Sequence, residues 1–406
     1  MDFKLLCPVV LLTVFMGAMG CDTIMTETPP AGDDFETPFE GMSHDLNAAF
    51  AAGDENFERA FTVEEGLGPI FNNSGCEGCH PGDGRGSFET SFFRFSRGPD
   101  LALNEGGAQH QDKAIPGVDP EDVPEGVDRS RRLPPPVFGV GLIGAIPEDT
   151  IVANEDPEDA DNDGISGRAH WVTAPAYVSE AHVGGGSGPQ LGRFSRKAQV
   201  SSLLQQIAEA YQQDMGITSD FIPEENSHPQ AGGVAIGDRV PDPEIPASTV
   251  LETVMYVRLL SPPARGEETA EVKQGETLFA SIKCASCHIP TMMTGPNSIP
   301  QLDRTEVNLY SDLLLHDMGS ELADNRPDGN GAEPADGQEW RTTPLWGLRV
   351  APDFLGGEAF YLHDGRTTSL HEAIRAHGGE AEESRAAYMG LSESEQQALI
   401  AFLESL

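Results

Sequence analysis

The sequence predicts a mainly α-helical fold made of two similar domains with long irregular insertions. A Cys-x-x-Cys-His run occurs twice, at residues 76–80 and 284–288, which indicates one functional unit in each half of the chain. Segments with helical periodicity lie in both halves, whereas residues 97–127 are polar and show no clear period. A chain of 406 residues is long enough for two or three domains that each bury a core.

The two Cys-x-x-Cys-His runs predict covalent haem attachment. In each run two thiols can form thioether bonds to haem vinyl groups, and the adjacent histidine can bind the iron. A zinc site would need a nearby second pair or spaced histidines, and a dithiol redox motif would need a βαβ context; neither context is visible. We therefore expect two haem c groups in two cytochrome c-like haem domains, held by Cys76, Cys79 and His80 in the first and by Cys284, Cys287 and His288 in the second.

The charge of the chain limits its partners. The sequence has 66 acidic and 25 basic residues, a formal net charge of -41. This excess argues against nucleic acid, because a phosphate backbone is bound by Lys and Arg patches. An acidic surface can steer a basic electron-donor protein such as a small cationic cytochrome, or it can serve solvation alone, and the sequence leaves both open.

The start of the chain predicts export. Residues 1–20 contain an apolar core and end in small residues, as a signal peptide does. The residues Ala-Met-Gly-Cys at 18–21 resemble a bacterial lipobox, so we expect a lipid anchor at Cys21 on the periplasmic side of a bacterial membrane. Ala18 stands where Leu is usual, so ordinary secretion is the alternative. Haem attachment through cysteine also implies a compartment outside the cytoplasm.

Residues 21–56 are expected to form a flexible acidic tether, since they are rich in Thr, Pro, Gly, Asp and Glu and have little periodicity. The N-terminal haem c domain would then span residues 57–262. Phe71 precedes the first attachment run and is expected to pack against the haem. Arg131 and Arg132 could pair with haem propionates, because guanidinium groups match carboxylates, or could form a solvated basic pair.

Helical periodicity predicts the remaining elements. Residues 197–215 have one apolar face and a stop at Gly216, and a second helix is expected at 248–260 before Pro262. The C-terminal haem c domain, 263–406, would open with a helix that leads into the second run. Capping boxes predict helix starts at Ser369 and Ser392. The last helix should pack on the first helix of this domain, as a cytochrome c fold requires.

Several further motifs support a family resemblance. Together with the attachment runs, they are similar over residues 57–406 to the di-haem oxidoreductases often labelled thiol oxidoreductases. More distantly, the chain resembles bacterial di-haem cytochrome c peroxidases and the di-haem enzyme that matures methylamine dehydrogenase. The motifs lie at residues 191–194, 214–216, 312–319, 342–347 and 362–366.

The resemblance implies different roles for the two haems. In those peroxidases one haem binds hydrogen peroxide at an open side, and the other relays electrons with two protein ligands. The haem on His80 would accordingly be open and the haem on His288 closed. His377 stands where the peroxidases carry a distal Met, which implies a bis-histidine relay; alternatively, His377 only caps its helix.

The resemblance also implies site residues. Asp214 and Gln206 are similar to the catalytic Glu and Gln of the peroxidases, although Asp214 could also be a solvent-exposed helix-end carboxylate. Trp346, or alternatively Trp171, would lie between the haems, unless either is simple core. A calcium ion between the haems is implied through the backbone carbonyls of Thr342 and Pro344.

Two hypotheses about function follow. The first is a peroxidase-like oxidoreductase that passes electrons from a donor protein through the C-terminal haem to an open N-terminal haem. The second is a two-haem electron-transfer cytochrome with both irons closed. Thiol exchange ranks last, because no cysteine beyond the haem runs and Cys21 is left for it. His316 and His363 lie in family motifs whose roles the sequence does not reveal.

Overall fold

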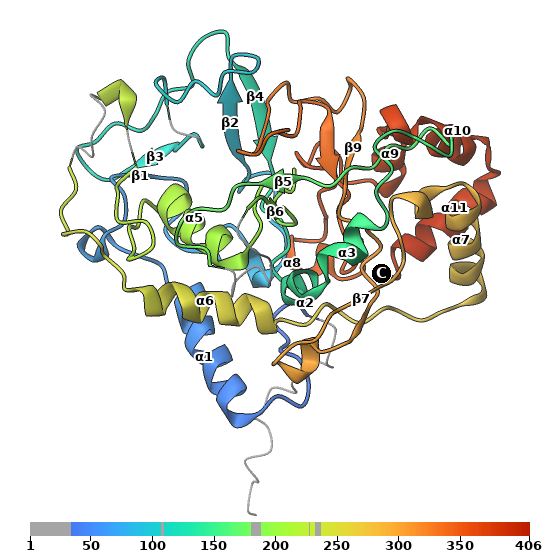
Figure 1. The fold of residues 1–406 in the computed structure, drawn as a ribbon, viewed down its shortest axis with the longest axis horizontal. Coiled ribbons are helices and arrows are strands. Elements are labelled where there is room, and N and C mark those ends of the chain that lie inside the picture. Colours follow the sequence, from blue (N-terminus) through green and yellow to red (C-terminus); the bar gives the residue numbers. More distant parts are fainter. Residues whose placement is uncertain (1–33, 107–108, 180–187, 227, 232–236) are drawn as a thin grey trace, which may run out of the picture. The chain divides into compact units, whose positions relative to one another are not determined.

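Two pairs of helices organise the structure (Figure 1). In the computed structural model, α1 (His44–Glu58) packs against α6 (Ala247–Leu259), and α7 (Ala270–Ser281) packs against α11 (Glu393–Leu403). The structure describes residues 34–106, 109–179, 188–226, 228–231 and 237–406. The expected signal peptide, Cys21 and the first part of the expected tether therefore lie outside the described residues.

A glycine allows each pair to approach at the level of the backbone. A Cβ atom added at Gly53 of α1 would lie 2.2 Å from the carbonyl oxygen of Glu252 in α6. A Cβ atom added at Gly275 of α7 would lie 1.9 Å from the carbonyl oxygen of Ala398 in α11. Both distances are far below a van der Waals contact, so each crossing requires glycine.

Hydroxyl caps set the starts of the longer helices. In each case the side chain of the N-cap residue accepts a hydrogen bond from a backbone N–H of the first turn, which satisfies one of the free donors there. This arrangement begins α1, α5 (Leu203–Met215), α7, α9 (Leu370–Arg375) and α11, with the caps Ser43, Ser202, Thr269, Ser369 and Ser392. The predicted helices before the second run and after Ser369 and Ser392 are confirmed by these elements, and the predicted helix before Pro262 is confirmed as α6, which follows Pro246 without a side-chain cap.

The prediction of a flexible tether up to residue 56 is wrong from residue 44 onwards, because α1 begins there. The chain is already packed upstream of this helix, since the Phe35 ring stacks on Phe138 with centroids 4.6 Å apart. The Thr37 carbonyl also accepts a hydrogen bond from the Ser261 N–H at 2.9 Å. The polar composition concealed a helix that is stabilised by contacts with α6, about 200 residues later.

The predicted helix at 197–215 begins later than expected, at Leu203. Ala198 has a φ of +51°, which is incompatible with a helix, and Ser202 caps the first turn. Lys197 is fully buried and its Nζ lies 2.8 Å from Asp324 Oδ1. Pairing with a residue far along the chain thus overrides the local helical period.

Short antiparallel strand pairs hold the insertions in place. The longest pair joins β2 (Phe92–Ser96) to β4 (Asp128–Arg132), with Phe92 opposite Arg132. Four more two-stranded sheets occur among the described residues. They are β1 (Ile70–Phe71) with β3 (Lys113–Ala114), β5 (Trp171–Val172) with β6 (Gln190–Leu191), β7 (Met292–Met293) with β8 (Glu306–Val307), and β9 (Leu315–Asp317) with β10 (Glu339–Arg341).

The remaining elements are short. The α-helices are α2 (Val140–Ala145), α3 (Glu148–Val152), α8 (Ala351–Phe354) and α10 (Glu382–Gly390). Single 3-10 turns occupy Val63–Glu65, Pro81–Asp83, Pro229–Ala231, Cys284–Ser286, Pro300–Leu302 and Gly379–Ala381. Long irregular segments between these elements agree with the expected insertions.

Residues 31–406 form one compact unit, which contains both expected haem domains. Residues of the first half bond to residues of the second through the backbone. Arg168 and Leu315 exchange two N–H···O bonds, and the Leu133 N–H donates to the His363 carbonyl at 2.9 Å. Within the described part of the chain, no helix has both the length and the apolar character needed to cross a membrane.

Candidate functional site

The first attachment run forms one wall of a cavity of about 360 Å³. The His80 N–H bonds the Cys76 carbonyl at 2.9 Å, so the run makes one helical turn that places both cysteines and His80 along the cavity. His80 Nδ1 lies 3.3 Å from the Gly84 carbonyl, and the Pro135 backbone also forms a hydrogen bond with the ring. Burial lowers the pKa of His80 to about 4, so the imidazole is in the neutral form that binds iron.

Phe57 of α1 supports this histidine. Its ring centroid lies 6.2 Å from that of His80, and the Tyr256 ring of α6 lies 5.3 Å from Phe57 on the other side. Phe71, which we expected against the haem, lies in β1 and is not among the residues that line the cavity. The supporting aromatic residue therefore comes from the helix that the sequence did not reveal.

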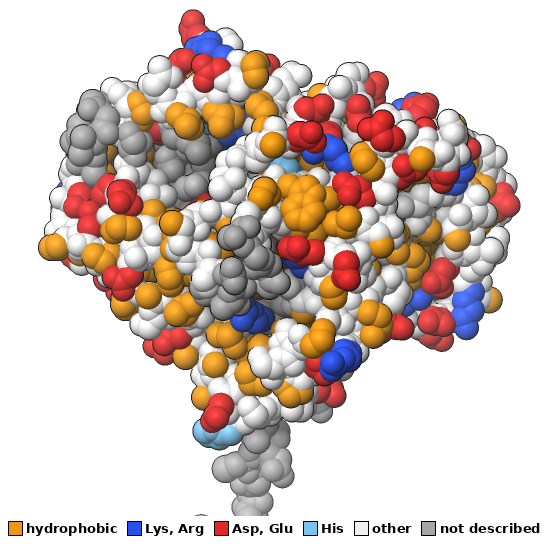
Figure 2. All heavy atoms as spheres, in the orientation of Figure 1, with side chains coloured by type: hydrophobic (Ala, Val, Ile, Leu, Met, Phe, Trp, Pro, Cys, Tyr) orange, Lys and Arg blue, Asp and Glu red, His pale blue; other side chains and the backbone are white. Residues whose placement is uncertain are grey.

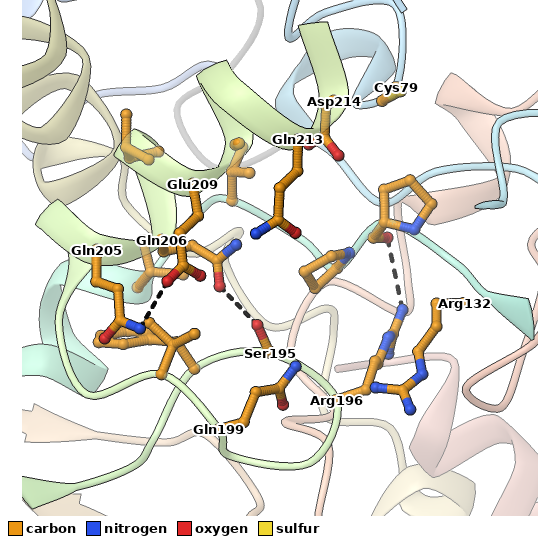
Figure 3. A pocket seen from close by; sticks show the side chains of 18 of the residues that line it. Cys79, Arg132, Ser195, Arg196, Gln199, Gln205, Gln206, Glu209, Gln213 and Asp214 are labelled. Carbon is orange, nitrogen blue, oxygen red and sulfur yellow. Dashed lines mark hydrogen bonds between the residues drawn. The ribbon is translucent and has the colours of Figure 1, made fainter. Parts of the chain in front are cut away.

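Helix α5 presents a polar face to the same cavity, as its labelled side chains in Figure 3 show. Residues spaced by four lie on one side of a helix, and here they are Gln205, Gln206, Glu209, Gln213 and Asp214. Gln206 Oε1 accepts a hydrogen bond from Ser195 Oγ at 2.7 Å. The proposed catalytic residues Asp214 and Gln206 thus both line the cavity that contains the first attachment run.

Asp214 lies close to the attachment cysteines. Its Oδ1 accepts a hydrogen bond from Gln109 Nε2 at 2.5 Å, and burial raises the pKa of Asp214 to about 6. Burial, followed by the nearby Asp214 charge, raises the pKa of Cys76 and of Cys79 to about 12. A carboxyl group in this position can hold or release a proton near neutral pH.

Glu209 is a cavity residue that the sequence reasoning missed. Its Oε1 accepts a hydrogen bond from Gln205 Nε2 at 2.8 Å, and burial raises the pKa of Glu209, opposed by the same hydrogen bond and by the charge of Arg94. The signal was present in the sequence, since Glu209 is four residues after Gln205 and four before Gln213. The sequence prediction used only the apolar face of this helix and not the polar residues on its other face.

The second attachment run lines a separate cavity of about 210 Å³ together with His377. His288 Nδ1 donates to the Tyr310 carbonyl at 2.9 Å, and His377 Nδ1 donates to the Ala373 carbonyl at 2.8 Å. Both histidines therefore keep Nε2 free for a metal. Burial lowers the pKa of His288 to about 4 and also lowers that of His377. His377 follows α9, bonds a carbonyl of that helix and lines the cavity as well, so capping and metal binding are compatible.

His316 and His363 also line the second cavity, in opposite charge states. His316 Nε2 lies 2.8 Å from Asp312 Oδ2, and its Nδ1 lies 2.7 Å from Glu380 Oε2. Although burial opposes the charge, these bonds raise the pKa of His316 well above its usual value, so it is a cation. The His363 ring stacks on Trp340 at 3.6 Å, and burial holds its pKa well below the usual range, so it is neutral.

Trp346 and Trp171 have different surroundings. Trp346 is 7% exposed and lines the first cavity, and its ring covers Gly139, where an added Cβ would lie 2.6 Å from a ring carbon. Trp171 is 38% exposed in β5 and lines neither cavity. Of these two tryptophans, Trp346 is the one that lines a cavity with an attachment run; Trp340, which was not considered from the sequence, lines the second cavity.

The two cavities share one wall. Arg196, Arg341, Thr343 and Pro344 line both of them. The neighbouring Thr342 carbonyl accepts a hydrogen bond from Ser311 Oγ at 2.7 Å. The expected calcium ligands Thr342 and Pro344 thus lie at this wall, while calcium itself stays a prediction.

Whether haem fits these cavities can be judged from the buried arginines whose hydrogen-bond donors lack partners. A buried unpaired donor is costly, so such donors indicate an anionic partner. Among the described residues, the Nε atoms of Arg85 and Arg193 and the Nη1 atom of Arg341 are buried and have no hydrogen-bond partner. All three arginines line one or both cavities, and haem propionates are carboxylates of suitable charge. Together with free thiols and neutral histidines, this donor set fits haem c in both cavities.

The arginines expected to pair with propionates are not the ones that fit best. Arg132 is buried but its Nη2 already contacts Asp324 at 2.8 Å and Asp328 at 2.5 Å. The Arg131 guanidinium lies 4.3 Å from the ring centroid of Phe93 on the adjacent strand. The alternative of a solvated pair is also wrong for Arg132, because the side chain is 2% exposed.

Two cavities, each lined by a Cys-x-x-Cys-His run, define a haem-binding redox protein. The chain belongs to the family described as "Di-haem oxidoreductase, putative peroxidase", whose model matches residues 14–100 and 117–406. This confirms the family resemblance that the motifs indicated, and the description of the family implies two haems. The chain matches no curated protein.

Two solved structures show likeness to the chain. Hydrazine synthase of Kuenenia stuttgartiensis, pressurized with xenon, is 15% identical with a TM-score of 0.39, over 98% of this chain and 100% of that one. A MauG-like protein associated with microbial copper homeostasis is 22% identical with a TM-score of 0.25, over 39% of this chain and 53% of that one.

Proposed function

We propose that the protein is a peroxidase-like di-haem c oxidoreductase in which the first cavity reacts with hydrogen peroxide and the second relays electrons. The observation that supports this proposal is that different residues line the two cavities. The second cavity has two histidines with free Nε2 atoms, His288 and His377. Among the described residues, the first cavity has His80 as its one histidine and carries a row of carboxyl and amide groups.

Bound haem supplies one-electron chemistry and peroxide activation, and the protein supplies orientation and proton transfer. Gln109 donates to Asp214 Oδ1, which leaves Oδ2 to take a proton and return it. A carboxyl with a pKa of about 6 is mostly ionised at neutral pH yet is readily protonated, as a general acid–base group requires. Glu209 and Gln206 extend the same polar face along α5.

Electrons are proposed to enter at the C-terminal haem and pass through the shared wall to the N-terminal haem. Trp346 lines the first cavity and belongs to the segment that includes Thr343 and Pro344 of that wall, so it is placed to shorten the transfer. Calcium bound by the carbonyls of Thr342 and Pro344 is a further part of this proposal, and metal analysis of the pure holoprotein tests it.

The proposed donor is a small basic electron-transfer protein. The net charge of -41 supports this class of partner, and Figure 2 shows acidic side chains spread over the face in view. The proposed location is the periplasmic side of a bacterial membrane with a lipid anchor at Cys21. Mass spectrometry of the mature N-terminus tests the anchor: an acylated Cys21 supports it, and an unmodified N-terminus contradicts it.

A two-haem electron carrier with both irons closed is the second candidate. The observation that favours it is Met215, which is 1% exposed and lines the first cavity. A methionine thioether is a sixth ligand in many cytochromes c. If Met215 binds the iron, the first cavity cannot accept peroxide.

Spectroscopy of the pure holoprotein separates the two candidates. Ultraviolet-visible and electron paramagnetic resonance spectra of the oxidised and half-reduced forms should show one high-spin and one low-spin haem if the first iron is open. Two low-spin haems in both forms would overturn the peroxidase proposal. The variant Met215→Leu then shows whether the thioether closes the site, and His377→Ala should convert the relay haem to high spin. His371→Ala is the matched control, because His371 lies on α9, just before His377 in the chain, and bonds Tyr388 instead.

A further inference from the structure

Three arginines at or next to the shared wall carry positive charge without a local counter-charge. Arg85, Arg196 and Arg341 are 7%, 5% and 8% exposed. Arg196 donates only to backbone carbonyls, at 3.1 Å from Nε and 3.0 Å from Nη2 to the Leu133 oxygen. Arg341 Nε donates to the Ser195 carbonyl at 3.0 Å, and its Nη1 has no partner.

None of these three arginines takes part in an ion pair within the described part of the chain, although each is charged and buried. Burial, and the charges of Arg85 and Arg341, hold the pKa of Arg196 well below its usual range. Asp364 and Asp312 act on Arg196 and Arg341 only at longer range. Burying charges of one sign together is costly unless an anion joins them.

The same region shows how the chain treats buried cations that need no ligand. Arg132, Lys197 and Arg326 lie nearby, and each contacts the carboxylate of Asp324 or Asp328. The wall arginines lack this compensation. An anion supplied from the cavities would therefore complete them.

We propose that Arg196 and Arg341 each bind propionate carboxylates from both haems, so that this pair of arginines joins the two cofactors electrostatically. The geometry behind this is that both side chains line both cavities, whereas Arg85 lines the second cavity alone and Arg193 the first alone. The inference rests on the two-haem part of the proposed function. It assigns these residues as positioning residues that set the potentials of both haems together.

The consequence for redox chemistry follows from charge. Reduction adds an electron to a haem, and a nearby cation stabilises the reduced form. Removing Arg341 should make both haems harder to reduce, while removing Arg85 should affect mainly the haem on His288 and removing Arg193 mainly the haem on His80. Loss of a residue with a merely structural role would not change the reduction potential of one haem selectively in one variant and of both haems in another.

The test is a spectroelectrochemical titration of the holoprotein with Arg341→Gln, Arg85→Gln and Arg193→Gln. We expect Arg341→Gln to change the reduction equilibrium of both haems about tenfold, which is 59 mV for a one-electron step. Each of the other two should shift one haem by a similar amount. Arg168→Gln is the matched control, because Arg168 is bound by both carboxylate oxygens of Glu339 and lines neither cavity.

Infrared difference spectra between the oxidised and reduced forms provide the second readout. Propionate carboxylate bands should shift in Arg341→Gln and in the charge-conserving Arg341→Lys, which also covers the case in which Arg341→Gln does not fold. Unchanged potentials and unchanged carboxylate bands in a variant with two haems, or a shift of one haem only, would overturn the inference. A wild-type haem content below two per chain would instead overturn the two-haem proposal.

Discussion

The helix pair α1–α6 and the helix pair α7–α11 support their histidines in the same way. Phe57 lies 6.2 Å from His80 at an interplanar angle of 52°, and Phe279 lies 6.2 Å from His288 at 54°. In each pair the supporting Phe follows the crossing glycine by four residues. The comparison teaches that the two helix pairs support the histidines of the attachment runs alike, so a difference in chemistry between the two cavities must come from other parts of the chain.

The difference lies in the insertions. Over the first cavity the insertion supplies α5, with carboxyl and amide groups such as Asp214 and Glu209. Over the second cavity it supplies α9 and the histidine that follows it, His377. One insertion lines its cavity with carboxyl and amide groups, to which the proposed function assigns proton transfer, and the other supplies a further histidine, to which it assigns iron binding.

Removal of the thioether cysteines has the largest expected effect on this comparison. Cys76→Ser with Cys79→Ser should eliminate one covalent haem, and Cys284→Ser with Cys287→Ser should eliminate the other. Pyridine haemochrome absorbance per chain should fall by half in each double variant. If one double variant retained full haem content, the two cavities would not be equivalent attachment sites.

Loss of Asp214 should affect the first cavity alone. Asp214→Asn removes the proton-accepting oxygen, and peroxide turnover should fall about 10²- to 10⁴-fold, the range typical of general acid–base groups. Turnover of the wild type should decline as pH falls through about 6, since the carboxyl then holds its proton. This decline should be absent from the residual activity of Asp214→Asn, and the low-spin signal of the second haem should remain. A variant with normal turnover would rule out this role.

A larger side chain at Gly53 or Gly275 should disrupt the packing of the helix pair to which the glycine belongs. Gly53→Val and Gly275→Val place atoms about where a carbonyl oxygen lies, so each should lower the free energy of unfolding by about 3 kcal/mol. Thermal and urea unfolding of the holoproteins measure this loss. Gly390→Ala in α10 is the control, because nothing lies within 4 Å of its added Cβ, and it should be neutral or slightly stabilising. A tolerant Gly53 would mean that the first pair is looser than the second.

A smaller effect concerns the aromatic residue on the last helix of each pair. Tyr256 in α6 donates a hydrogen bond to the buried Asp83, whereas α11 has Phe402 at the corresponding place beside Phe279. Tyr256→Phe converts the first pair to the chemistry of the second. It should cost about 1–3 kcal/mol of stability, because the Asp83 carboxyl loses its donor.

The same carboxyl gives this pair a pH dependence of stability. Burial raises the pKa of Asp83 to about 7 in the folded protein, so folding favours the protonated form. Its contribution is complete below about pH 4 and is lost as pH rises through about 7. Asp83→Asn should flatten this part of the stability curve, and Tyr256→Phe should steepen it. Equal slopes in all three proteins would contradict the assignment.

Local signals in the sequence account for the elements that could be predicted. The attachment runs are contiguous, and α11 begins with the capping box at Ser392 that the sequence shows. Helix α1 was missed because its stability depends on contacts with α6. Lys197 was wrongly included in the predicted helix because its partner, Asp324, lies 127 residues away in the sequence. Contacts of such sequence separation leave no local pattern.

The residues of the candidate site also fall into those that the sequence predicted and those that it could not predict. The family motifs led to Asp214, Gln206 and Trp346, which all line the first cavity, while their chemical roles remain predictions. The wall arginines Arg196 and Arg341 could not be identified, because their isolation from carboxylates depends on how both halves of the chain pack. Burial and the absence of a counter-charge are properties of the folded protein alone.

Backbone hydrogen bonds and the shared wall connect the two halves of the chain. The backbone bonds between Arg168 and Leu315, and between Leu133 and His363, cross from one half to the other. A chain divided after residue 262 would expose these edges and half of the wall on each piece. Each half therefore supplies part of the surface that closes the other, so we expect a division at this point to remove hydrogen-bond partners from both pieces.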